Sequence, residues 1–181
     1  MTTFKSVLVS TLFVFSLFAA TATWASSLTE SQENAVRSAK HYLSLEGFSR
    51  RGLIQQLSSS LGSGYSVADA TVAVDSLHIN WDKEAVRSAK QYLSLEGFSR
   101  RGLIQQLSLG SGYSVAEATV AVDSLHINWD KEAVRSAKQY LIIEGFSCRG
   151  LVQQLSSSVG AGTGYTVSQA TYGAQKAGAC Q

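Results

Sequence analysis

The chain has 181 residues, of which 45% are hydrophobic and 15% are charged, so it carries enough apolar side chains to form packed cores. Its 15 basic and 13 acidic residues leave a net charge of +2, far from the strongly basic surface that is typical of nucleic-acid-binding proteins. The composition therefore argues against a nucleic-acid partner.

Residues 1–25 have the pattern of a secretory signal peptide. Lys5 gives a positive start, Val7 to Ala20 form an apolar run, and Thr23 and Ala25 are the small residues of a cleavage site. The run is shorter than the ~20 residues of a membrane span, although an uncleaved anchor remains the alternative. We expect cleavage after Ala25 and export to the periplasm or cell envelope. No lipobox cysteine lies near the junction, so the mature N-terminus has no lipid acceptor.

A unit of roughly 50 residues then occurs three times, a period typical of tandem arrays of small supersecondary units. The stretch AVRSAKHYLSLEGFSRRGLIQQL begins at Ala35, and near-copies begin at Ala85 and Ala133. We assign unit 1 to residues 26–78, unit 2 to 79–126 and unit 3 to 127–181. A unit this small is marginally stable alone, so contacts between units should matter.

Each unit is expected to contain about three short helices, which predicts an all-α fold. In the first helix, Ala35, Ala39 and Tyr42 form an amphipathic stripe, and Gly47 should end the helix as a C-terminal glycine. The hydroxyl of Ser49 should cap the second helix. The third helix should begin with a capping box, a cap residue paired with the third helical residue. The three pairs are Ser66–Asp69, Ser114–Glu117 and Thr166–Gln169.

Gly52 lies inside the second helix and recurs as Gly102 and Gly150, which suggests close packing against another helix. After this helix comes a Ser/Gly-rich segment whose length differs between the units. Such a change in length is typical of a surface loop.

Trp81 and Trp129 begin units 2 and 3, whereas unit 1 has Ser31 at this position. Tryptophan therefore occurs only where an upstream unit exists. We interpret both rings as packing residues between units rather than as a ligand platform.

The two cysteines, Cys148 and Cys180, both lie in unit 3. In an oxidising compartment they can pair, and export favours a disulfide over free thiols.

Basic residues recur at the start of each second helix, where cations are slightly unfavourable against the helix dipole. This cost favours a binding role, although a solvated face is the simpler interpretation. The candidate contact residues are Arg50, Arg51, Arg100, Arg101 and Arg149.

The segments SQENAVRSAKHYL, GFSRRGLIQQL, GYSVADATVAVDSL and INWDKEAVRSAK, in this order, resemble the repeat of the Ltp family of phage-encoded lipoproteins exposed on the host surface. The resemblance covers Ser31 to Thr171. It implies helix–extension–helix repeats and a role in superinfection exclusion. In that role the protein would block a second phage's DNA from entering the cell, by engaging the incoming tape-measure protein or another injected phage protein.

No nucleophile elbow, phosphate-binding loop, dinucleotide motif or metal-ligand spacing is found, so we expect no enzyme, cofactor, metal or small-molecule substrate. Two alternatives to the phage-binding module stay open. One is a generic envelope-associated helical-repeat protein. The other is a nucleic-acid-binding helix–extension–helix protein whose signal peptide has been misread.

Overall fold

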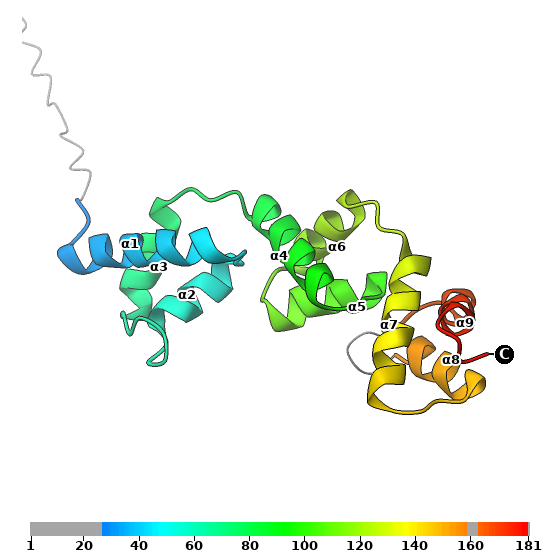
Figure 1. Ribbon diagram of the computed structural model, residues 1–181. Helices are drawn as coiled ribbons and strands as arrows, with labels where there is room; N and C mark the ends of the chain where they lie inside the picture. The colour runs from blue at the N-terminus through cyan, green and yellow to red at the C-terminus, as the bar shows by residue number, and fades with distance from the viewer. Residues whose placement is uncertain (1–26, 159–162, 181) are drawn as a thin grey trace, which may run out of the picture.

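The computed structural model describes residues 27–158 and 163–180, within which the chain forms nine α-helices and one π-helical turn. The helices follow one another in three groups of three along an extended array (Figure 1). The expected all-α array of three helical units is confirmed. The expected signal peptide and its cleavage site lie outside the described residues.

Unit 1 contains α1 (Glu30–Leu45), α2 (Arg50–Ser58) and α3 (Val67–Ser76). Unit 2 contains α4 (Trp81–Leu95), α5 (Arg100–Gln105) and α6 (Val115–Ser124). Unit 3 contains α7 (Trp129–Ile143), α8 (Cys148–Ser156) and α9 (Val167–Lys176).

Short polar side chains begin all nine described helices. Each accepts a hydrogen bond from the backbone N–H three residues later, which satisfies one of the unpaired donors of the first turn. The caps are Thr29, Ser49, Ser66, Asn80, Ser99, Ser114, Asn128, Ser147 and Thr166. Of the capping boxes expected at the third helices, those at Ser114 and Thr166 form in full, and Thr29 makes another at the start of α1. In unit 1 the Asp69 carboxylate instead accepts hydrogen bonds from Ser31 and Gln32 of α1.

Each unit has its own small core. The first helix packs against the third, and the second helix also packs against the third. In unit 1 the core holds Leu53, Leu57 and Val74 with alanines of α1 and α3. Equivalent residues form the cores of units 2 and 3. Small alanines at the crossing let the helices approach closely, which suits a core with few large side chains.

The tryptophans lie where one unit joins the next. Trp81 is the first residue of α4 but packs against the core of unit 1, and Trp129 of α7 packs against the core of unit 2. The core of unit 3 is instead covered by Ala177, Ala179 and Cys180. Cys180 is joined to Cys148 at the start of α8 by a disulfide.

Unit 2 differs from the sequence-based expectation after α5. The segment expected to be a loop continues as a π-helical turn, Gln106–Gly110. Unit 2 has two residues fewer here than unit 1. The wider helical turn carries the chain to Tyr113, which is buried in the same role as Tyr165.

Candidate binding surface

The paired arginines at the start of each second helix divide into two kinds. Arg50 donates two hydrogen bonds to Asp75 at the end of α3, both at 2.7 Å. Arg100 makes the same pair with Asp123, at 2.6 and 2.7 Å. These hydrogen bonds lower the pKa of both aspartates. Two of the five predicted contact residues therefore hold the second helix to the third within their own unit.

The outer arginines, Arg51, Arg101 and Arg149, recur once per unit and are exposed. In unit 1, an open groove of about 520 Å³ runs between α2 and the start of α3, lined by Arg50, Arg51, Ile54, Gln55, Ser58 and Val67. Val67 is 64% exposed, and Val115 and Val167 are similarly exposed at the same position of units 2 and 3. Unit 1 thus presents a cation and an uncovered apolar side chain along one groove, and the equivalent arginine and valine are exposed in units 2 and 3.

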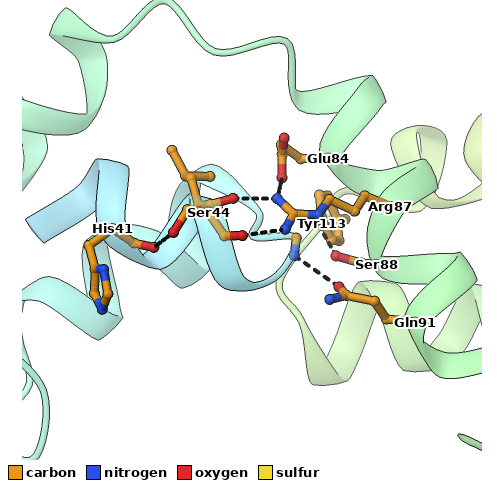
Figure 2. A network of polar contacts seen from close by, with 9 residues as sticks. His41, Ser44, Glu84, Arg87, Ser88, Gln91 and Tyr113 are labelled. Atoms are coloured by element: carbon orange, nitrogen blue, oxygen red, sulfur yellow. Dashed lines mark hydrogen bonds and ion pairs between the residues drawn. The ribbon is translucent and has the colours of Figure 1, made fainter.

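A polar junction joins units 1 and 2 (Figure 2). The guanidinium of Arg87 in α4 donates to the carbonyl of Leu43 and, at 3.2 Å, to that of Ser44 at the end of α1. Gly47 donates its N–H to Oε1 of Gln91 at 2.9 Å. A short extension away, the Ser49 hydroxyl donates to the Ser111 carbonyl at 2.6 Å.

The junction has two complementary halves. The helix-end half lies at the end of the first helix and the start of the second. In unit 1 it consists of Leu43, Ser44, Gly47 and Ser49. We call the residues that receive it, Arg87, Ser88, Gln91 and Ser111 in unit 2, the helix-face half.

Units 2 and 3 repeat this junction at the equivalent positions, with Thr163 at the position of Ser111. Arg135 donates to the carbonyls of Leu93 and Ser94, Gly97 donates to Gln139 at 2.9 Å, and Ser99 donates to the Thr163 carbonyl. The array therefore continues by one recurring contact rather than by flexible linkers.

A largely buried glutamate accompanies each junction arginine. The Glu84 and Glu132 carboxylates lie 3.8 Å from Arg87 and Arg135, and one oxygen of each has no hydrogen-bond donor among the described residues. Burial raises the pKa of Glu132, and the nearby Arg135 opposes that shift. Such a carboxylate costs stability unless the arginine stays beside it.

Two glycines serve a different purpose from the one expected. α1 ends at Leu45 with an extended Glu46, and a methyl group at Gly47 would lie 2.5 Å from Ser88 Oγ. Gly47 is therefore required by the close approach of unit 2, not by a left-handed helix end. Likewise, Gly52 lies against the carbonyl of Ser111, in a loop of the next unit rather than in a helix.

Sequence reasoning missed the junction residues Arg87, Gln91, Arg135 and Gln139. Their signal was present: unit 1, the first of the described units, has His41 where units 2 and 3 have glutamine. It also has Asn34 where they have Glu84 and Glu132. The same logic that pointed to Trp81 applies to these positions.

Among residues 27–158 and 163–180, no cluster of histidine, cysteine, aspartate and glutamate could hold a metal ion. No helix of this part of the chain is long and apolar enough to cross a membrane. Both cysteines of the sequence, Cys148 and Cys180, are joined in the disulfide.

Comparison with known proteins identifies the unit. The family model described as "Host cell surface-exposed lipoprotein" (Ltp) matches three times, at residues 30–77, 80–125 and 128–176. The chain is also similar to the solved structure of Ltp, a superinfection exclusion protein from the Streptococcus thermophilus temperate phage TP-J34. The identity is 28% and the TM-score 0.50, over 56% of this chain and 100% of that one. No curated protein matches. Since the three matches cover well over half of its residues, the chain belongs to the Ltp family of host cell surface-exposed lipoproteins.

Proposed function

We propose that the protein acts in superinfection exclusion, by binding an injected phage protein such as the tape-measure protein and so keeping a second phage's DNA out of the cell. The observation that carries this proposal is the likeness, in both sequence and fold, to the superinfection exclusion protein of phage TP-J34. The function is binding rather than catalysis, because tandem units offer an extended surface.

The proposed contact surface, which we call the arginine row, consists of one arginine per unit, Arg51, Arg101 and Arg149, with the exposed valines that begin the third helices. Arginine and a desolvatable apolar neighbour are the combination that often dominates protein interfaces. Arg50 and Arg100 border this row while holding their own units together. The side chains of Arg51 and Arg101 also lie beside Gly112 and Gly164 of the next unit, so in units 1 and 2 the proposed surface adjoins the junction.

We also propose that the protein is exported with its signal peptide cleaved after Ala25. The disulfide supports this, because disulfides persist mainly in oxidising compartments. Mass spectrometry of the cell-envelope fraction should find a mature N-terminus at Ser26. An intact form beginning at Met1 in the cytoplasm would contradict both the export and the function that depends on it.

A phage challenge tests the function. Cells expressing the protein should adsorb phage normally but admit less phage DNA than cells without it. The triple variant Arg51→Glu, Arg101→Glu, Arg149→Glu should lose most of this protection while keeping its helical circular dichroism. The matched control is Lys40→Glu, Lys90→Glu, Lys138→Glu, which makes the same charge change at exposed positions of the three first helices and should protect like the wild type.

Two outcomes would contradict the proposal in different ways. Equal loss of protection in both triple variants would show that net charge, not the arginine row, matters. If the folded, exported protein protects against no member of a broad phage panel, the exclusion role fails and a generic envelope-binding module takes its place.

A further inference from the structure

The two internal junctions leave one half unmatched at each end of the described array. The unmatched half of unit 3 is its helix-end half, made by Leu141, Ile142, Gly145 and Ser147. The unmatched half of unit 1 is its helix-face half, made by Arg37, Ser38, His41 and Ser63. These residues occupy the positions of the groups that bond at both internal junctions.

The helix-end half of unit 3 is uncovered among the described residues. Ser49 and Ser99 are 2% and 1% exposed because the next unit covers them, whereas Ser147 at the same position is exposed. A methyl group at Gly97 would lie 2.5 Å from Ser136 Oγ, whereas one at Gly145 would meet nothing within 4 Å. The backbone that a neighbour would need to approach closely is therefore accessible.

The helix-face half of unit 1 is open as well. A hollow of about 280 Å³ is lined by Arg37, Ser38, His41, Tyr42 and Ser63. On unit 2, Gly47 of the preceding unit lies against the equivalent Ser88 and Gln91. Arg37 is exposed, and its guanidinium donates to the side chain of Asn34. Asn34 is at the position of Glu84, which lies beside Arg87 in unit 2.

We propose that the two open halves bind each other between two copies of this chain, head to tail, in the geometry of the internal junctions. Arg37 of one copy would donate to the carbonyls of Leu141 and Ile142 of the other. His41 would accept the Gly145 N–H through a ring nitrogen, in the place of the glutamine oxygen. Ser147 would donate to the carbonyl of Ser63. Equivalent groups bond in this arrangement twice within the chain, except that Gln91 and Gln139 stand at the position of His41.

The contact is weaker than an internal junction for a structural reason. An internal junction is reinforced by a covalent linker and by Trp81 or Trp129 on the upstream core, whereas unit 1 begins with Ser31 and the core of unit 3 is covered by its own tail. Ile142 and Ile143 add little, because both positions stay exposed at the internal junctions. Ser44 and Ser94 are exposed at the position of Ile142, and Leu45 and Leu95 are 62% and 74% exposed at that of Ile143. Because the two halves differ, the contact does not close on itself in a dimer and can lengthen the array.

Sedimentation velocity of the exported chain, over a range of concentrations up to about millimolar, tests the proposal. The wild type should show reversible, concentration-dependent association. Gly145→Ala should lower the association constant about tenfold or more without destabilising the monomer, because the added methyl meets nothing in its own molecule. Arg37→Glu should have the same effect from the other end. The double variant Asn34→Glu, His41→Gln restores the internal sequence and should strengthen association.

Each result decides the matter. A wild type that stays monomeric at every concentration overturns the proposal, as does association that Gly145→Ala and Arg37→Glu leave unchanged. Lys40→Glu, a charge reversal at an exposed position on the same helix as Arg37, should leave association unchanged. The inference does not depend on the proposed role in phage exclusion, since association is measured without phage.

Discussion

In units 1 and 2 an arginine–aspartate pair joins the second helix to the third, whereas in unit 3 a disulfide joins the second helix to the segment that follows the third. At the arginine position unit 3 has Cys148, and at the aspartate position it has Gln175. Cys180 occupies the place of Asn80 and Asn128, which in the other units cap the helix of the next unit. A unit with a successor can rely on a weak internal contact, because the successor's tryptophan covers its core. The last described unit closes on itself instead.

Removing the disulfide should have the largest effect. The double variant Cys148→Ser, Cys180→Ser should lose about 3–4 kcal/mol of stability in unit 3, since the bond closes a loop with a sequence separation of 32. Urea unfolding followed by circular dichroism measures the loss. The matched double variant Arg50→Ala, Asp75→Ala should lose less than about 1 kcal/mol, because its ion pair is half-exposed. Equal losses would mean that the two fastenings are equivalent.

Trp81→Ala should be the next most damaging change, at about 2–3 kcal/mol, because it uncovers the core of unit 1 from the side of unit 2. The control is Leu95→Ala on the same helix, where a 74% exposed side chain should cost less than about 0.5 kcal/mol. Thermal or urea unfolding gives both values. A small effect of Trp81→Ala would show that the ring does not support the junction.

Adding a methyl group to the junction glycine should lower stability in an internal unit but not in the last described unit. Gly97→Ala should cost about 1–3 kcal/mol, because the added carbon would lie 2.5 Å from Ser136 Oγ and 2.7 Å from its backbone nitrogen. Gly145→Ala, at the same position of unit 3, should be neutral or slightly stabilising. Paired urea titrations compare the two, and an equal cost would contradict the close approach seen at Gly97.

Acid should slightly lower the stability of units 1 and 2, which have the ion pairs, and should leave the disulfide of unit 3 unaffected. The Arg50 and Arg100 hydrogen bonds lower the folded-state pKa of Asp75 and Asp123. The stabilisation is therefore full above the ordinary aspartate pKa of about 4, and is lost as pH falls through the lowered values. The difference in stability between the wild type and Asp75→Asn, Asp123→Asn should shrink below about pH 4. A constant difference across pH would contradict the ion-pair role.

Much of the fold follows from features that single residues carry in the sequence. Ser49 and Thr166 could be predicted as caps because a hydroxyl just before a helix can accept a hydrogen bond from an N–H of its first turn. Trp81 pointed to the junction because a large ring is absent where no upstream unit is described. The disulfide followed from having only two cysteines in a chain that we expect to be exported, and the structure pairs them.

The junction itself was harder to predict because half of it is backbone. The acceptors for Arg87 are the carbonyls of Leu43 and Ser44, whose side chains give no sign of this role. Gly47 resembles an ordinary helix end until the neighbouring helix is in place. The π-helical turn after α5 likewise depends on how the shortened segment must reach Tyr113, which local propensity does not encode.

Because every unit carries both halves of the junction, the array is modular at the level of the gene. A tandem duplication of one unit yields a copy that already fits the copy before it and the copy after it, with no compensating substitution. Units 1 and 2, which are nearly identical over residues 35–57 and 85–107, look like the product of such an event. Only the terminal positions then have to diverge, and His41, Asn34, Cys148 and Cys180 are where they have done so. Members of this family can therefore differ in the number of units while keeping one and the same joint.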